Sequence, residues 1–162
     1  MIIQDVKRIL DLREQIHALD EAMAELADQS ELACRIGSVQ GFGKTCVAEL
    51  AGEIGTTERF AGEGSLALYV GMNPLDDRFG KHRGSKCPRL VNHRAKAAMM
   101  TAVAHHIRCV PQSRAYYDKK RAEGKTHNQA VRSLGRHLVR VIWSMVKNER
   151  DYELREVTPS VT

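Results

Sequence analysis

The sequence is poor in aromatic residues and contains no long apolar run. Aromatic residues make up only 5% of its 162 residues, so a core would be built mainly from Ala, Val, Leu, Ile and Met. No apolar stretch approaches the ~20 residues that a membrane-spanning helix needs. The first residues also lack the basic segment and apolar region of a signal peptide. We therefore expect a soluble, cytoplasmic protein without a membrane partner.

The four cysteines show no CxxC spacing. A chain of this length can bury a core without disulfide bonds, which favours reduced thiols. The segment from Cys87 to Cys109 also contains three histidines, but the spacing of these residues matches no zinc-binding pattern. We predict that this chain holds no metal site and no cofactor of its own.

Charge is distributed unevenly along the chain. Residues 1–33 carry a net charge of −5 and the remaining 129 residues carry +10. Residues 75–108 alone contain eight Lys or Arg and only two acids. Ordinary solvated surfaces mix positive and negative side chains, so this excess of positive charge favours a groove that binds phosphates over a merely solvated face. Nucleic acid is the first candidate partner for the basic part of the chain.

Apolar residues near the N-terminus recur in steps of three and four, as in the seam of a coiled coil. No Gly or Pro occurs between Gln4 and Glu31, which predicts one continuous helix over that range. The seam spans about three heptads, a short length for self-association. Two interpretations stay open: a homodimer through residues 9–26, or packing of the stripe on its own chain. The seam residues are Ile9, Leu12, Ile16, Leu19, Met23 and Leu26.

A glycine turn follows in the segment Val39-Gln40-Gly41-Phe42-Gly43. Its pattern of apolar, any, Gly, apolar, Gly is the core of a helix-hairpin-helix motif. Gly41 and Gly43 would allow a tight turn and a close approach of the backbone to a phosphate. A helix opening at Lys44 and Thr45 would then point its free N–H groups at that anion. Such contacts hold a nucleic-acid backbone without reading its sequence.

This segment has two other interpretations. Gly43-Lys44-Thr45 resembles the end of a P-loop, but Ser38 stands where that motif needs Gly and no buried strand precedes it, which argues against ATP binding. A helix–turn–helix corner without any ligand is the alternative that stays open.

The rest of the chain predicts further helices over residues 63–70, 89–110, 113–123 and 126–147, with a polar loop over 76–88. Thr126 and Gln129 have the spacing of a capping box, and Trp143 is expected in the core. Arg132, Arg136 and Arg140 repeat every four residues. They form either a second phosphate-binding stripe or a solvated face.

Taken in order, these landmarks resemble the C-terminal half of transposases of the insertion-sequence-110 family, also called the 116/110/902 or DEDD transposases and related to the pilin-gene invertase. The resemblance covers residues 32–150 and implies a recombinase that moves or inverts DNA. In that family an N-terminal RuvC-like domain holds four carboxylates that bind Mg²⁺, a C-terminal Ser is the nucleophile, and a structured guide RNA brings the DNA partners together. The resemblance rests on residues 36–45, 50–55, 59–60, 66–74, 80–84, 113–117 and 124–130.

The sequence departs from the family pattern in two ways. It begins at the coiled coil, so the RuvC-like carboxylates and their Mg²⁺ have no counterpart. Phe79 also stands where the family has its nucleophilic Ser, and the nearby hydroxyl is that of Ser85, several residues further on. We therefore expect that this chain alone does not cleave DNA. In the enzymatic alternative, this chain cleaves and joins DNA with Ser85, a weak catalytic candidate, or with residues of a partner chain. It predicts a protein–DNA adduct that Ser85→Ala abolishes.

The sequence thus predicts an all-α protein with a coiled-coil helix (1–33), a helix-hairpin-helix domain (34–150) and a tail (151–162). Its predicted function is DNA binding within a transposase, associated with the nucleoid, with guide RNA as a further partner. The alternative is a dimerising regulatory module without nucleic-acid contact. The predicted nucleic-acid-binding residues are Gly41, Gly43, Lys44, Thr45, Arg78, Lys81, Arg83, Lys86, Arg89, Arg94, Lys96, Arg132, Arg136 and Arg140.

Overall fold

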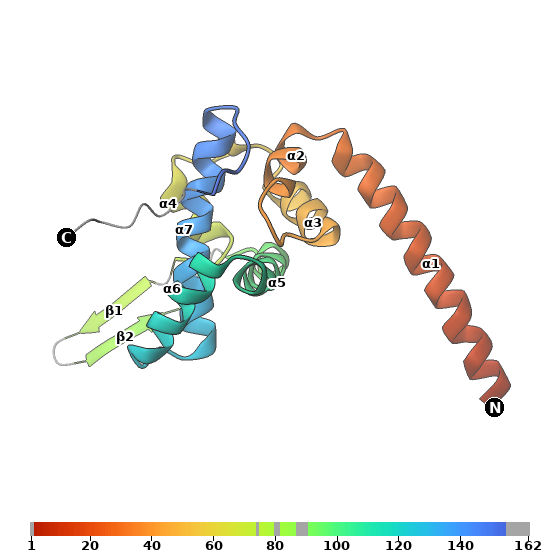
Figure 1. Ribbon diagram of the computed structural model, residues 1–162, viewed down its shortest axis with the longest axis horizontal. Helices are drawn as coiled ribbons and strands as arrows, with labels where there is room; N and C mark the ends of the chain where they lie inside the picture. Colours follow the sequence, from red (N-terminus) through yellow and green to blue (C-terminus); the bar gives the residue numbers. More distant parts are fainter. Residues whose placement is uncertain (1, 74, 80–81, 87–90, 155–162) are drawn as a thin grey trace.

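The computed structural model describes residues 2–73, 75–79, 82–86 and 91–154. Figure 1 shows one long helix, α1 (Ile2–Asp28), projecting from a body of shorter helices. The all-α class is therefore confirmed, with one small β-hairpin added. None of the helices in these ranges is both long and apolar enough to cross a bilayer. The body contains α2 (Glu31–Gly37), α3 (Lys44–Ile54), the 3₁₀ turn η1 (Thr57–Arg59), α4 (Glu63–Tyr69), β1 (Leu75–Phe79), β2 (His82–Lys86), α5 (His93–Cys109), α6 (Pro111–Ala122) and α7 (His127–Lys147).

The N-terminal helix ends earlier than the sequence predicted. α1 stops at Asp28 and α2 starts at Glu31, so the prediction of one continuous helix from Gln4 to Glu31 was wrong at its C-terminal end. The side chain of Ser30 caps α2 by accepting a hydrogen bond from the N–H of Ala33 at 3.3 Å. A serine hydroxyl offers the backbone this local alternative to a continued helix, and that explains the break.

The apolar stripe of α1 does not pack on the rest of its own chain between Ile9 and Leu19. No residue of α1 is buried, and the exposed fractions of Ile9 and Leu19 are 56% and 63%. Contact with the body is confined to the C-terminal end of the helix, where Met23 and Ala27 border a hollow shared with α3. From Ile9 to Leu19 the stripe is thus a free apolar surface in a single copy of the described chain.

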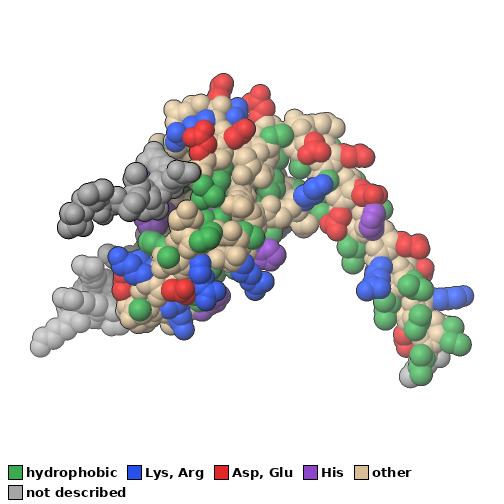
Figure 2. All heavy atoms as spheres, in the orientation of Figure 1, with side chains coloured by type: hydrophobic (Ala, Val, Ile, Leu, Met, Phe, Trp, Pro, Cys, Tyr) green, Lys and Arg blue, Asp and Glu red, His purple; other side chains and the backbone are tan. Residues whose placement is uncertain are grey.

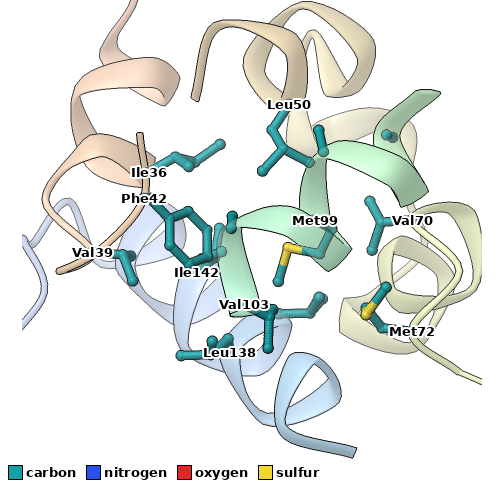
Figure 3. Packing of buried hydrophobic residues seen from close by; sticks show 14 of the residues in the cluster. Ile36, Val39, Phe42, Leu50, Val70, Met72, Met99, Val103, Leu138 and Ile142 are labelled. Atoms are coloured by element: carbon teal, nitrogen blue, oxygen red, sulfur yellow. The ribbon is translucent and has the colours of Figure 1, made fainter. Parts of the chain in front are cut away.

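The core lies where α3, α5 and α7 meet (Figure 3). Leu50 of α3, Met99 and Val103 of α5 and Ile142 of α7 are almost fully buried there. As the composition predicted, aliphatic residues and methionines supply most of this core. Small alanines on the inner face of α5 let the neighbouring helices approach closely, and burying these side chains drives the packing of the body.

Helix α5 begins later than predicted, and its buried side is not the one that its apolar residues alone would indicate. It starts at His93, where the side chain of Asn92 caps it by accepting from the N–H groups of Arg94 and Ala95; residues 89–90 lie outside the described ranges. Ala97 is exposed, whereas its neighbours Ala95 and Ala98 are buried. A helix rich in Ala and Met has little contrast between its faces, so its buried side is poorly specified by periodicity.

The last two helices match their predicted signals. Pro111 occupies the first turn of α6, where its missing N–H costs nothing. The capping box of Thr126 and Gln129 is present at the start of α7. Trp143 is partly buried against the core, with the Nζ of Lys147 5.5 Å from its ring.

Residues 76–88 were predicted as a loop, and that prediction was wrong for residues 76–79 and 82–86; residues 80–81 and 87–88 lie outside the described ranges. β1 and β2 form an antiparallel hairpin in which Leu75 pairs with Lys86 and Phe79 with His82. The hairpin projects from the body on the side away from α1 (Figure 1). Hydrogen bonds between the two backbones pair the strands. Because these bonds do not require apolar side chains, the strands lack the alternating apolar pattern by which a strand is predicted from sequence.

Candidate nucleic-acid interface

The turn between α2 and α3 is fixed to α5 on its inner side. Gly41 has a φ of +86°, and a Cβ at this position would lie 2.9 Å from the Cα of His106. The Nδ1 of His106 also lies 2.6 Å from the carbonyl oxygen of Gln40. Gly41 is therefore needed for a left-handed backbone and for close packing on α5. The sequence pattern had assigned this glycine to the phosphate side of the turn.

The outer side of the same turn faces solvent. Gly43, Lys44 and Thr45 are exposed, and a Cβ on Gly43 would meet nothing within 4 Å among the described atoms. Gly43 is the N-cap residue of α3 and supplies no side-chain hydrogen bond. The first N–H groups of a helix have no intrahelical partner and carry a partial positive charge. These amides and the Lys44 side chain thus stand together at one exposed helix end.

The β-hairpin contains the next group of predicted binding residues. Arg78 lies on β1, opposite Arg83 on β2, and Lys86 ends β2. Lys81 and Arg89 lie outside the described residues. The register therefore places two arginines of the basic segment opposite one another on a hairpin that projects from the body (Figure 1).

The register also places Phe79 and Ser85 at different levels of the hairpin. Phe79 pairs with His82, whereas Ser85 pairs with Asp76. Three ladder positions separate these two pairs, which corresponds to about 10 Å along a strand. The backbone of Ser85 thus lies well away from the position that Phe79 occupies.

Arg94 is held by two carboxylates of α3. Its Nε lies 2.7 Å from Oε1 of Glu49 and 3.0 Å from Oε1 of Glu53. The Arg94 hydrogen bond lowers the pKa of Glu49. Glu53 also accepts a hydrogen bond from the Asn92 amide at 2.6 Å. Arg94 therefore joins α3 to the start of α5, and Lys96, the other predicted residue of α5, is partly buried.

The three arginines of α7 do not form one uniform stripe. Arg136 and Arg140 both pair with Glu63 of α4, at 2.9 Å and 3.1 Å. Hydrogen bonds from Arg136, more than from Arg140, lower the pKa of Glu63. Arg132 has no such partner among the described residues and lines a separate pocket between α6 and α7. The structure thus adds an ion bridge between α4 and α7 to the two interpretations drawn from the sequence.

With this geometry in place, comparison with known proteins identifies the family. The sequence model described as the transposase IS116/IS110/IS902 family matches residues 33–118, more than half of the chain. The chain belongs to this transposase family. The matched range runs from α2 into α6 and includes the glycine turn and the hairpin.

Relatives from insertion elements of this transposase family agree with the match. The chain is 32% identical to the 43.6 kDa protein of insertion element IS110 from Streptomyces coelicolor, 35% to the 42 kDa protein of IS900 from Mycobacterium paratuberculosis, and 33% to the 44.8 kDa protein of IS116 from Streptomyces clavuligerus. About nine-tenths of the chain is covered in each comparison. The chain spans only 36–38% of the length of these relatives.

Sequence reasoning missed several cationic residues of this transposase domain. Lys120 and Lys125 line the same pocket as Arg132, beside Tyr116 and His137. The hydroxyl of Tyr116 lies 3.0 Å from Nε2 of His137 and helps to dock α6 on α7. Figure 2 shows Lys and Arg side chains gathered over the part of the body where α6 lies. The many Lys and Arg residues between positions 114 and 136 could have indicated this pocket from the sequence. A charge count confined to residues 75–108 does not include them.

Proposed function

We propose that this chain is a nucleic-acid-binding part of a transposase and holds phosphates of a DNA strand without reading base sequence. The observation that carries the proposal is the outer side of the α2–α3 turn, where uncapped amides, Lys44 and open space at Gly43 stand together. An anion placed there would meet backbone donors, a positive helix end and an ammonium group. Membership of a transposase family supports DNA as the polyanion.

A second group of cations offers phosphate contacts elsewhere on the molecule. Residues 78–89 hold five Lys or Arg against no acid, and Arg78, Arg83 and Lys86 of this segment lie on the strands of the projecting hairpin. Phosphate contacts by such residues fix the position of a strand and contribute equally for all sequences. Guide RNA offers the same phosphate chemistry, so we propose it as the alternative polymer at this surface.

Binding of a fluorescent DNA duplex, followed by anisotropy over a range of salt concentrations, tests the proposal. If about six phosphates are neutralised, log K should fall against log salt with a slope of about −5. Joint replacement of Lys81, Arg83 and Arg89 by Ala should weaken binding to unrelated duplexes by the same factor. A flat salt response, or a loss confined to one sequence, would contradict phosphate binding.

Lys44→Gln tests the helix end on its own. We expect weaker binding by about three- to tenfold, as for one lost charge-assisted contact. Lys7→Gln is the matched control because it removes the same charge from an exposed position on α1. If the two variants weaken binding equally, Lys44 contributes only through the net charge of the protein, which would contradict a site at this helix end.

We also propose that α1 pairs with a second copy of the chain through residues 9–26. The exposed apolar stripe of α1 is the specific observation in its favour, since burying it removes apolar surface from water. Flanking charges select the direction of the pair. A parallel pair would bring Arg8 opposite Arg13 of the other helix, whereas an antiparallel pair brings Arg13 opposite Asp20. The antiparallel arrangement is therefore favoured.

A further inference from the structure

A pocket of about 490 Å³ opens between α6 and α7, apart from the glycine turn. Residues from α6, from the α6–α7 connection and from successive turns of α7 line it, with one methionine from the segment after α4. No Asp or Glu is among the described lining residues, whereas five can carry a positive charge. The lining consists of Met72, Tyr116, Lys120, Lys125, Gln129, Arg132, Ser133, Arg136 and His137.

Arg132 is the distinctive member of this lining. Its Nε is fully buried and has no hydrogen-bond acceptor within the part of the chain that the structure describes. Arg136, one turn further along α7, instead shares its guanidinium with Glu63 at 2.9 Å. A buried charged donor without an acceptor is unfavourable, and native structures rarely keep one without a purpose. An anionic ligand in the pocket would give this guanidinium group, which has no ion pair among the described residues, an opposite charge to pair with.

The neighbours of Arg132 reinforce a positive potential in the pocket. The pKa of His137 is lowered by burial and further by the charges of Arg140, Arg136 and Lys120. Lys120 is oriented by a 2.9 Å ion pair with Glu123 and lies 5.4 Å from the ring of Tyr116. Cations concentrated in a partly enclosed space attract anions more strongly than the same cations spread over an open surface.

The chemistry of the lining narrows the class of ligand. A metal cation is disfavoured because the described lining offers no carboxylate, and an apolar ligand would leave the Arg132 guanidinium without an acceptor. Gln129 and Ser133 are already engaged: the Gln129 side chain accepts from the N–H of Thr126, and the Ser133 hydroxyl donates to the Gln129 carbonyl. Arg132 and Lys125 are therefore the charged donors of the lining that form no ion pair with a described residue, and the amide N–H groups of Gln129 lie beside them.

We propose that this pocket binds a phosphate group of a nucleic-acid strand, with Arg132 and Lys125 as its principal donors. The proposal rests on the proposed function for the nature of the polymer, but the pocket is a separate site from the α3 helix end. A volume of about 490 Å³ lies within the usual range of ligand pockets. It allows either a terminal phosphate or a phosphodiester to reach Arg132.

Nuclear magnetic resonance of the full chain tests the pocket directly, with the Arg132 Nε–H and the His137 ring as reporters. The probes are inorganic phosphate, a short oligonucleotide with a 5′-phosphate, and the same oligonucleotide with a 5′-hydroxyl. We expect saturable shifts of Arg132 and a rise in the pKa of His137, because a bound anion offsets the neighbouring cations. Shifts with phosphate and the 5′-phosphorylated strand alone indicate a terminal phosphate, and equal shifts with the 5′-hydroxyl strand indicate a phosphodiester.

Substitutions provide the second arm of the test. Arg132→Gln and Lys125→Gln should each weaken oligonucleotide binding by about tenfold, as for one charge-assisted contact. Lys119→Gln is the matched control because it removes a charge from an exposed position on α6 that does not line the pocket; we expect less than about a twofold effect. Thermal unfolding checks that each variant is folded.

The outcomes separate the two proposals. If the wild-type chain binds DNA with steep salt dependence but no probe shifts Arg132, and Arg132→Gln binds as tightly as the control, the pocket proposal is overturned and the proposed function stands. If phosphate shifts Arg132 while no nucleic acid binds, the pocket stands as an anion site and the proposed function fails.

Discussion

The Nδ1 atom of His106 lies 2.6 Å from the carbonyl oxygen of Gln40 and joins the α2–α3 turn to α5. Because a carbonyl only accepts, Nδ1 carries the proton and the neutral ring has a bare Nε2. That Nε2 is buried and has no partner among the described residues. Burial lowers the pKa of His106, and the hydrogen bond to Gln40 offsets part of this effect. The glycine turn is thus held in place by a neutral histidine.

Stability should therefore fall on acidification through the range where free histidine titrates. The unfolded chain takes up a proton near pH 6.5 while the folded chain does so only at lower pH, so the free energy of unfolding decreases as pH falls below about 6.5. The slope from this one group is at most about 1.4 kcal/mol per pH unit. Urea unfolding at about pH 7.5, 6.5 and 5.5 measures it.

Two variants assign that pH dependence to His106. His106→Gln should flatten the slope, leaving the contribution of His137, whose pKa is also lowered. The exposed neighbour His105 serves as the control, and His105→Gln should keep the wild-type slope. An unchanged slope in His106→Gln would show that the ring does not stay neutral in the folded state.

Gly41→Ala should destabilise the body strongly. A methyl group at Gly41 meets the Cα of His106 at 2.9 Å, and the φ of +86° is strained for any residue with a side chain. We expect a loss of about 2–4 kcal/mol in the free energy of unfolding. Gly43→Ala is the control: its φ is −74° and its Cβ meets open space, so the loss should stay below about 1 kcal/mol. Similar losses in both variants would contradict the packing of the turn on α5.

Local sequence signals predicted the helices that carry them. α3 starts after Gly43 and ends before Gly55, and α7 starts at the capping box of Thr126. In each case a glycine or a capping side chain satisfies or interrupts backbone hydrogen bonds within a few residues. Such signals are readable without knowledge of the tertiary structure, and the start of α3 and both ends of α7 were predicted nearly to the residue.

The candidate site was less predictable because its decisive contacts are long-range. Arg94 meets Glu49 across 45 positions and Arg136 meets Glu63 across 73. Ion pairs between residues so far apart leave no periodic pattern in the sequence. A prediction from sequence therefore treats every arginine as a cation that is available for binding. The pocket around Arg132 likewise exists only after α6 docks on α7. Net charge predicted a basic body, but packing decides which cations stay free.

Glu63→Gln tests whether the ion bridge restrains the arginines of α7. The change frees Arg136 and Arg140 from a carboxylate, so we expect tighter binding of a DNA duplex by about two- to fivefold at low salt. Stability should fall by about 0.5–1 kcal/mol, since the pair is partly exposed. Because Arg136 lowers the pKa of Glu63, this stability is present at neutral pH and is lost as pH falls below the ordinary range of a glutamate.

The matched control is Glu58→Gln. Glu58 is an exposed acid on η1, and its change alters the net charge by the same amount. If both variants tighten DNA binding equally, the gain reflects net charge and the bridge does not limit the availability of the two arginines.

Arg13→Asp distinguishes the two directions in which α1 can pair. In an antiparallel dimer the change places a second carboxylate opposite Asp20 and should weaken association by about two- to tenfold; in a parallel dimer it removes the repulsion with Arg8 and should strengthen it. Sedimentation equilibrium measures the dissociation constant. Lys7→Glu, an equal reversal of charge sign at an outward heptad position, should have little effect. A tighter dimer in Arg13→Asp would contradict the antiparallel pair, and a monomer in the wild-type chain at all accessible concentrations would remove the self-association proposed for residues 9–26.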